Sequence, residues 1–192
     1  MTSNGIRFRR LWRLVLYALT QPTDLFDAGL LIKYCLRICL LTDDRAAVAT
    51  LVKKFVDRVL LKRVRLAALD RLRWHKQQNH GIVFVSASPD LYLTEFVSRL
   101  GVDRLLCTKF LSEEGNFSGN LFSANCKGEE KRRRLLEAYP VTEIDWGQSY
   151  GYGNSVDDVA FLELLGNAVA INPDAQLKKI ALRRNWAIEI WS

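Results

Sequence analysis

The spacing of hydrophobic positions changes near residue 80 of this 192-residue chain. Before that point, apolar residues recur every three or four positions with Arg and Lys between them, which predicts amphipathic helices over residues 6–19, 24–41 and 43–76. After that point, short β-branched and aromatic runs alternate with helical stretches. This alternation predicts a parallel sheet that is covered by helices on both faces.

The second part of the chain divides into alternating units. We predict strands over residues 81–88, 105–110, 149–155, 168–172 and 186–191, helices over 89–100, 128–139, 156–166 and 173–185, and a hairpin over 113–123. The chain therefore reads as two parts, a helical region over residues 1–78 and an α/β core over residues 79–192.

Charge separates the same two parts. Residues 1–78 hold 16 Lys and Arg against 6 Asp and Glu, a net charge of +10, while residues 79–192 carry −3. The basic helices either form a bundle with a solvated face or lie on an anionic membrane surface. They also permit electrostatic binding to nucleic acid, but no aromatic-basic readout motif accompanies them, so we expect no specific nucleic-acid binding. No stretch reaches 18 uncharged apolar residues, so no membrane-spanning helix is predicted.

Cysteine and histidine are sparse. The chain has two histidines, His75 and His80, which we interpret as surface residues near the junction of the two parts. Its four cysteines, none of them in a CxxC pair, are Cys35, Cys39, Cys107 and Cys126. Neither a zinc cluster nor a disulfide framework is supported, and we expect reduced cysteines in a cytoplasmic protein.

Polar side chains gather where two predicted strands end. Residues 86–88 follow one strand, and the glycine-rich turn GYGNSVDD delivers polar side chains over residues 154–158. Ligands of parallel sheets bind at the carboxyl ends of the strands, so both clusters are candidate site residues.

Three segments in this order resemble the haloacid dehalogenase superfamily of phosphatases, in its phosphoserine phosphatase-like branch. VFVSASPDLYL resembles the family's second motif, NCKGEEKRRRLLE its third and GYGNSVDDVAFLELLGNAVAINPD its fourth. The resemblance covers residues 81–192 and implies an α/β fold, a three-layer Rossmann-like parallel sheet with an N-terminal helical cap.

The resemblance also implies roles for particular residues. It implies phosphate binding by Ser86, Ala87 and Ser88, a catalytic lysine at Lys127 or Lys131, and Mg²⁺ binding by Asn154, Asp157 and Asp158. The family hydrolyses phosphate monoesters through an aspartyl-phosphate intermediate, in which lysine and Mg²⁺ stabilise the transferring phosphoryl group. The substrate would be a small phosphorylated metabolite or a lipid phosphate.

The chain departs from the family pattern in two places. The first motif, DxDGT, which supplies the nucleophile, does not occur before residue 81, and TDLFDAG at residues 23–29 has the wrong spacing inside a helical pattern. In the fourth motif, Asn154 stands at the usual position of an aspartate, and its amide brings no charge to Mg²⁺. We therefore expect the central first strand to be missing, and the chain by itself to be poorly stable and inactive.

Three interpretations remain open at this point. The sequence could begin directly after its own nucleophile motif, through a misplaced start codon or a genuine loss, and translating the upstream DNA would distinguish these. It could instead be a catalytically dead relative retained as a binding or regulatory module. The third interpretation is a basic module for membrane surfaces or nucleic acid on a sheet scaffold.

Overall fold

A computed structural model describes residues 45–110, 122–140 and 144–192 of the chain. The predicted helices over 6–19 and 24–41, and most of the predicted hairpin over 113–123, lie outside these residues. Within the described residues, no helix combines the length and the apolar character that crossing a bilayer requires.

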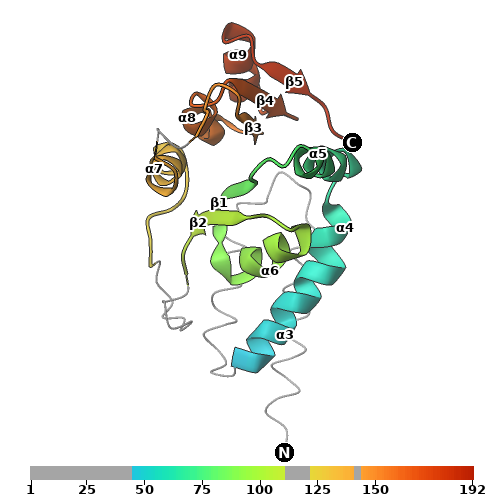
Figure 1. Ribbon diagram of the computed structural model, residues 1–192. Helices are drawn as coiled ribbons and strands as arrows, with labels where there is room; N and C mark the ends of the chain where they lie inside the picture. Colours follow the sequence, from blue (N-terminus) through green and yellow to red (C-terminus); the bar gives the residue numbers. More distant parts are fainter. Residues whose placement is uncertain (1–44, 111–121, 141–143) are drawn as a thin grey trace, which may run out of the picture.

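The predicted helical segment 43–76 is broken in two. It contains α3 (Arg45–Phe55), a π-helical turn η2 (Val56–Leu60), the short α4 (Leu61–Arg63) and α5 (Leu66–Gln77). Val64 and Arg65, between α4 and α5, are extended, with ψ of 124° and 140°. The break redirects the chain, so that α3 contacts α6 while α5 reaches strands near the C-terminus (Figure 1).

The core elements follow in the predicted order. They are β1 (Val83–Pro89), α6 (Asp90–Leu100), β2 (Arg104–Thr108), α7 (Glu129–Ala138), β3 (Tyr150–Gly153), the 3₁₀ helix η3 (Val156–Asp158), α8 (Val159–Leu162), β4 (Asn167–Ile171), α9 (Ala175–Arg183) and β5 (Ala187–Glu189). Every strand pair is parallel, as predicted. The helix predicted over 156–166 is shorter, because three-residue turns close at Leu164 and Leu165 and end it.

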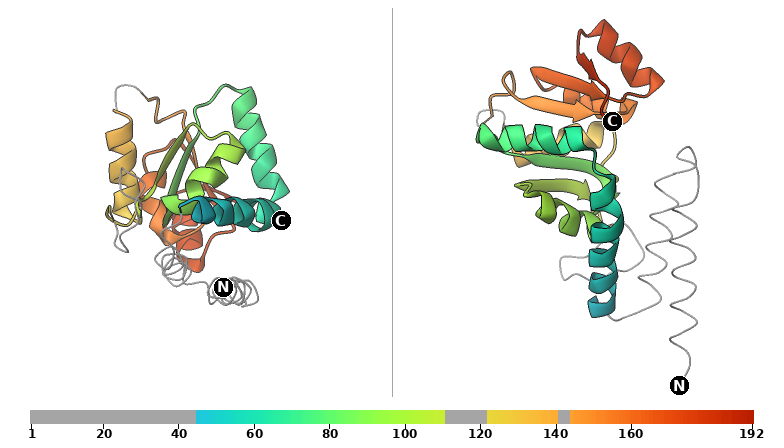
Figure 2. Two further views of the ribbon diagram at one scale, coloured as in Figure 1. Left: turned by 90° about the horizontal axis from the view of Figure 1, so that it is seen from below. Right: turned by 90° about the vertical axis from the view of Figure 1, so that its right-hand side faces the viewer.

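The strands form two separate sheets. β1 pairs with β2, from Val83 opposite Arg104 onward, and the second sheet has the order β3-β4-β5. Figure 1 shows the β3-β4-β5 sheet with α9 above it and α8 at its left, and β1, β2 and α6 below. The right-hand view of Figure 2 shows the same two levels of strands from the side. Among the described residues, no strand joins β1 to β3, the position at which we expected the central strand to be missing.

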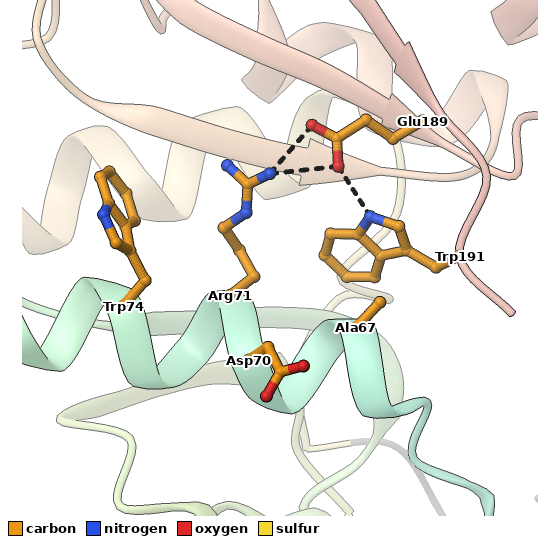
Figure 3. Close-up of a pocket in the computed structure, with 6 residues that line it drawn as sticks. All are labelled: Ala67, Asp70, Arg71, Trp74, Glu189 and Trp191. Carbon is orange, nitrogen blue, oxygen red and sulfur yellow. Dashed lines mark hydrogen bonds and ion pairs between the residues drawn. The ribbon is translucent and has the colours of Figure 1, made fainter.

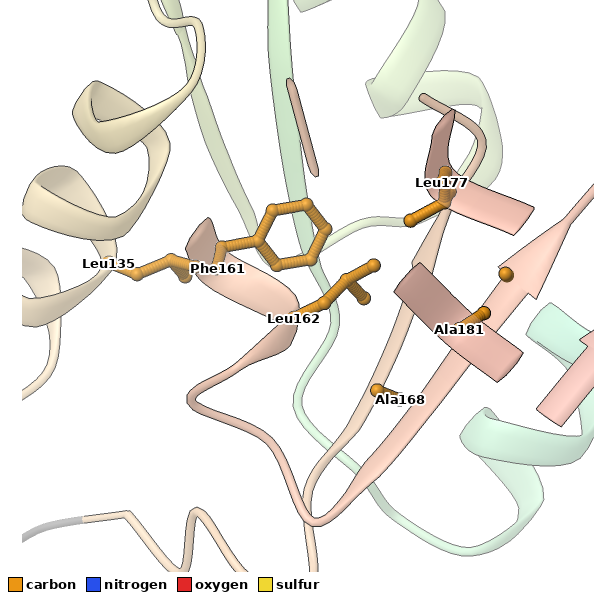
Figure 4. Packing of buried hydrophobic residues seen from close by; sticks show 7 residues of the cluster. Leu135, Phe161, Leu162, Ala168, Leu177 and Ala181 are labelled. Carbon is orange, nitrogen blue, oxygen red and sulfur yellow. The ribbon is translucent and has the colours of Figure 1, made fainter. Parts of the chain in front are cut away.

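One hydrophobic cluster nevertheless connects the two sheets. Its buried members come from α7, α8, β4 and α9 (Figure 4): Leu135, Phe161, Leu162, Ala168, Ala170, Leu177 and Ala181. Val83 and Val85 of β1 and Leu106 of β2 pack against this cluster. The sheets therefore share a core without sharing a hydrogen-bond ladder.

Candidate active site

A buried ion pair joins two of the predicted site residues. Lys131 lies in the first turns of α7, and its Nζ is 2.5 Å from Oδ1 of Asp158 in η3. The two side chains are only 10% and 6% exposed. Each charge is compensated by the other, which is the condition for placing a lysine or an aspartate inside a protein.

The second carboxylate oxygen of Asp158 stabilises the turn that follows β3. Oδ2 accepts hydrogen bonds from the backbone N–H groups of Asn154 at 2.9 Å and Ser155 at 3.1 Å. Ser155 and Asp158 form a reciprocal capping box, which satisfies backbone donors at the start of a helix. The Asp158 carboxylate thus holds the turn and neutralises Lys131 at the same time.

Gly153 leaves the space that this carboxylate occupies. A Cβ atom at position 153 would lie 2.6 Å from Cβ and 3.0 Å from Cγ of Asp158. Glycine is therefore required at position 153 because Asp158 packs closely against it. Backbone conformation is not the reason, since the φ of Gly153 is not in the left-handed region.

A second Lys–Asp pair lies one helical turn away and is open to solvent. Nζ of Lys127 is 3.2 Å from Oδ2 of Asp157, with side chains 56% and 35% exposed. Such an exposed pair contributes about 0 to 1 kcal/mol to stability, because water and salt screen it. Lys127 is therefore free to leave Asp157 for another anion.

The predicted phosphate-binding residues end β1. The Oγ of Ser86 accepts a hydrogen bond from the Ser88 N–H at 3.1 Å, and the pairing register of β1 with β2 shifts between Ser86 and Pro89, so the three residues form a bulged, turn-like end of the strand. Among the hydrogen bonds and ion pairs of the described residues, none joins Ser86 directly to Lys131 or Asp158. The structure pairs each lysine with an acid, and it connects the end of β1 to the segment before Lys127 only through an intermediate residue.

Thr108 at the end of β2 makes that connection. Its buried hydroxyl lies 2.8 Å from the Ala87 carbonyl oxygen, to which it donates, and accepts a hydrogen bond from the Cys126 N–H at 3.0 Å. The residue before Lys127 is thereby held against the polar turn of β1. Reasoning from the sequence missed Thr108, since a threonine at a strand end carries no distinctive signal.

Arg134 is a second residue that reasoning from the sequence missed. It lies in the basic run KRRR at 131–134, yet its side chain is only 12% exposed. It donates hydrogen bonds to the carbonyls of Cys107 and Ala124, and so ties α7 to the loop that carries Lys127. Arg134 follows Lys131 by three residues and so lies on the same face of α7, and this spacing could have indicated that it is buried.

Asp174 fixes the turn after β3 from the other side. It caps α9 through Leu177 N–H at 2.7 Å, and its other oxygen accepts from Val156 N–H at 3.0 Å. Its own N–H donates to the Asn154 carbonyl at 2.9 Å. The segment Asn-Pro-Asp before a helical pattern is an N-cap signal and could have indicated this role.

The two cysteines in the described residues are free and buried. Burial raises the pKa of Cys107 to about 12, and burial likewise raises the pKa of Cys126. A thiol with a raised pKa holds little thiolate at neutral pH and is a poor nucleophile. Neither is therefore a substitute for the missing aspartate, and Cys35 and Cys39 lie outside the described residues.

The predicted metal ligands do not by themselves fit a Mg²⁺ site. Both oxygens of Asp158 already have partners, Asp157 pairs with Lys127, and Asn154 is an uncharged amide. Within the described residues, no group of three or more His, Cys, Asp and Glu side chains could hold a metal ion. Mg²⁺ needs oxygen ligands with free lone pairs in an octahedral arrangement, and these three side chains do not supply such a set as they are arranged.

A cavity of about 470 Å³ lies apart from the predicted residues, between α5 and the C-terminal segment (Figure 3). The residues that line it are Ala67, Asp70, Arg71, Trp74, Glu189 and Trp191. Nη2 of Arg71 is 3.0 Å from Glu189 Oε1, and Trp191 Nε1 donates to Oε2 of Glu189 at 2.7 Å. These groups satisfy one another, and the cavity contains none of the residues that the motifs predict.

The comparison with family models decides the classification. The model of the haloacid dehalogenase-like hydrolases matches residues 8–163. The chain belongs to this family. The resemblance on which the sequence interpretation depends, and the α/β fold with parallel strands, are thereby confirmed.

Known proteins support the phosphatase branch of the family. A probable phosphatase of Mycobacterium tuberculosis is 28% identical over 145 residues, which are 76% of this chain and 50% of that protein. A phosphoserine phosphatase of the same organism is 27% identical over 143 residues, covering 74% of this chain and 46% of that protein. The chain spans about half the length of these curated relatives.

A solved structure shares the fold over nearly the whole chain. It is a protein of unknown function from Bordetella pertussis, with a TM-score of 0.71 and 21% sequence identity. The likeness covers 97% of this chain and 83% of that one. At this identity it supports the fold and not an activity.

Proposed function

We propose that this chain provides most of the phosphate-binding site of a phosphatase that hydrolyses a phosphate monoester. The observation that carries the proposal is the buried Lys131–Asp158 pair at the carboxyl end of β3. A buried ion pair adds little net stability, because removing both charges from water is costly. Its presence at a strand end of a phosphatase-family fold is therefore better explained by anion chemistry than by folding.

The two lysines would act differently. Lys131 is held in one position by Asp158, so its ammonium would offer its remaining N–H groups to a phosphate at a fixed place, with its charge partly compensated by the carboxylate. Lys127 is exposed and loosely paired, so its ammonium can rotate toward a phosphate held at the Ser86 turn. Fixed positive charge and hydrogen-bond donors around a phosphoryl group are what phosphoryl transfer requires from a protein.

Two components of the reaction would come from elsewhere. The described residues contain no aspartate nucleophile between β1 and β3, and the motif DxDGT is absent from residues 1–80. In the complete reaction of this family, such an aspartate forms the aspartyl-phosphate and Mg²⁺ is the usual cofactor. We propose that the chain requires a strand carrying this aspartate, in the position between β1 and β3, for turnover.

The substrate class follows from the relatives and remains a proposal. One relative is named as a phosphoserine phosphatase, which favours a small phosphorylated metabolite. A lipid phosphate is the alternative, with contact to a membrane surface through the basic N-terminal helices. Residues 1–44, which would make that contact, lie outside the described residues. We also propose a cytoplasmic location, which the free thiols of Cys107 and Cys126 support.

A second function is favoured by the site itself. Both acids of the fourth motif are paired with lysines, and the described sheets have unpaired edges where the central strand would lie. A chain in this state binds phosphate without hydrolysing it. It would then serve as a binding or regulatory module.

One set of variants distinguishes the two functions. We would extend the chain at its N-terminus with an apolar strand ending in DxDGT, and measure hydrolysis of p-nitrophenyl phosphate and phosphoserine with and without Mg²⁺. The unextended chain, and an extended chain ending in NxNGT, are the matched controls. We expect Mg²⁺-dependent turnover only for the DxDGT extension, with a further loss in its Lys127→Ala or Lys131→Ala variant.

Each outcome has a defined meaning. Turnover by the unextended chain would overturn the requirement for an added strand. If the DxDGT extension binds orthovanadate but is inactive, the binding-module function is supported. If no form binds vanadate or phosphate, both functions are wrong.

A further inference from the structure

The end of β1 contains a β-bulge. The parallel register of β1 and β2 is regular up to Ser86, and the next residue of β1 that pairs is Pro89, opposite Thr108. Ala87 and Ser88 fall between these two positions and lie outside the regular ladder. A bulge leaves backbone groups that need other partners and turns side chains in new directions, and bulges are common beside functional sites.

Two side chains supply partners for the peptide group inside this bulge. The carbonyl oxygen of Ala87 accepts a hydrogen bond from the Thr108 hydroxyl at 2.8 Å. At the other end of the same peptide group, the N–H of Ser88 donates to Oγ of Ser86 at 3.1 Å. The peptide is trans, so its C=O and N–H point to opposite sides. Fixing the carbonyl therefore also fixes the N–H that contacts Ser86.

The Thr108 hydroxyl itself has a defined direction. Its oxygen is buried and accepts a hydrogen bond from the Cys126 N–H at 3.0 Å. A hydroxyl has one hydrogen to donate, and Ala87 at 2.8 Å is a closer acceptor than Oδ1 of Asn125 at 3.2 Å. The hydrogen bonds thus run from Cys126 through Thr108 and the bulged peptide to Ser86, and we call this series the Thr108 relay.

The Thr108 relay leaves the Ser86 hydroxyl with an available hydrogen. In the part of the chain that the structure describes, Oγ of Ser86 accepts from Ser88, and no hydrogen bond uses its hydrogen. Ser86 is only partly buried, so a ligand can reach it. Successive hydrogen bonds polarise one another, which makes a hydroxyl that accepts from an N–H a better donor. A donor in a fixed position is what a phosphate oxygen requires.

We propose that Thr108 is a positioning residue of the phosphate site: its hydroxyl fixes the bulged peptide of β1, so that Ser86 presents its hydroxyl hydrogen to a phosphate oxygen. This inference rests on the proposed function. The segment before Lys127 has a separate anchor, because Arg134 donates to the Ala124 carbonyl at 2.6 Å. Thr108 therefore acts on phosphate through Ser86 rather than through Lys127.

The test removes the hydroxyl and keeps the shape of the side chain. Vanadium NMR line broadening measures orthovanadate binding to the 192-residue chain and to its Thr108→Val and Thr108→Ser variants. We expect about tenfold weaker binding in Thr108→Val, as for loss of one hydrogen bond to an anion, and a change of about twofold or less in Thr108→Ser. Thr94→Val is the matched control and is expected to bind as the natural chain does, since the exposed Thr94 hydroxyl donates to the Asp90 carbonyl within α6.

A double-mutant cycle separates positioning from a general loss of structure. If Thr108 acts through Ser86, then Thr108→Val, Ser86→Ala and the double variant each bind orthovanadate about tenfold more weakly, because the second substitution has no further contact to remove. Independent effects would multiply to about a hundredfold in the double variant. That result would overturn the inference.

A further measurement does not depend on the folding of Thr108→Val. The proton NMR signal of the buried Thr108 hydroxyl is expected to move downfield when orthovanadate binds to the natural chain, and to stay in place in Ser86→Ala. A signal that does not respond in the natural chain contradicts the relay.

The outcomes also separate this inference from the proposed function. Equal orthovanadate affinity in the natural chain and in a folded Thr108→Val removes the positioning role alone and leaves phosphate binding intact. Absence of binding by the natural chain overturns the proposed function, and the role of Thr108 with it.

Discussion

At the scale of single residues, two neighbouring acids differ in burial and in the number of contacts that they make. Asp157 and Asp158 are adjacent in the sequence, and each pairs with a lysine of the same segment. Asp158 is buried and holds the turn after β3, whereas Asp157 is partly exposed and makes only its pair. The sequence predicted both as metal ligands, because residue type and spacing do not tell which of two acids faces the interior.

The difference predicts unequal costs for the same substitution. Asp158→Ala leaves Lys131 as an uncompensated buried charge, which destabilises by about 3 to 5 kcal/mol. Asp157→Ala removes a screened pair and changes stability by about 1 kcal/mol or less. Urea unfolding monitored by circular dichroism measures the free energy of unfolding of both variants. If Asp158→Ala shows no cooperative transition because it is already unfolded, that result also agrees with the prediction. Equal shifts in the two variants would show that the Lys131 pair is not buried in solution.

At the scale of elements, periodicity predicted the strands and helices of the core well. The predicted runs 81–88 and 168–172 match β1 and β4 to within a residue or two at each end, because apolar β-branched residues bounded by polar ones leave few alternatives. The same reasoning failed at residues 43–76. The apolar spacing continues past Val64 and Arg65, so no local sequence signal marks the break between α4 and α5. The break allows α3 to contact α6 while α5 contacts β3.

The break between α4 and α5 predicts where proline is accepted. Arg65 has φ of −67°, and Val64 before it is extended, as the residue before a proline should be. Arg65→Pro is therefore expected to raise stability by about 0.4 to 1 kcal/mol through the unfolded state. Arg73→Pro, in the interior of α5, is the control and is expected to cost about 3 kcal/mol.

Thermal unfolding of the two proline variants decides this point. A higher midpoint for Arg65→Pro with a lower one for Arg73→Pro fits a true interruption of the helix. Should Arg65→Pro destabilise as much as Arg73→Pro, residues 43–76 form the single helix that the periodicity predicted.

At the scale of the whole molecule, two sheets share a core but not a ladder. β4 lies between β3 and β5 and is almost entirely buried, whereas the apolar residues of β1 remain partly exposed. Strand alternation predicted the parallel α/β class, which the structure confirms. The motif comparison predicted that a central strand would be missing, and within residues 45–110, 122–140 and 144–192 no strand joins β1 to β3. The packing of α5 against β3 and β5 was not predictable, since it depends on side chains far apart in the sequence.

This arrangement predicts an uneven distribution of local stability. Amides that are hydrogen-bonded within a buried central strand exchange only through large unfolding events, while those near an open sheet edge exchange through small ones. We expect the slowest hydrogen exchange at Val169, Ala170 and Ile171, and faster exchange at Phe84 and Val85. Mass spectrometry of peptic fragments measures this. Uniform protection across both sheets would mean that they unfold as one laddered unit.

Gly153 has a consequence for directed evolution of this fold. Because Asp158 fills the volume that a Cβ would need, even the smallest side chain at position 153 must push the carboxylate away from Lys131. A mutagenesis library meant to alter specificity should therefore leave that codon invariant and place its diversity at exposed neighbours such as Val156. Otherwise many clones would be lost to misfolding before selection could sample any new chemistry.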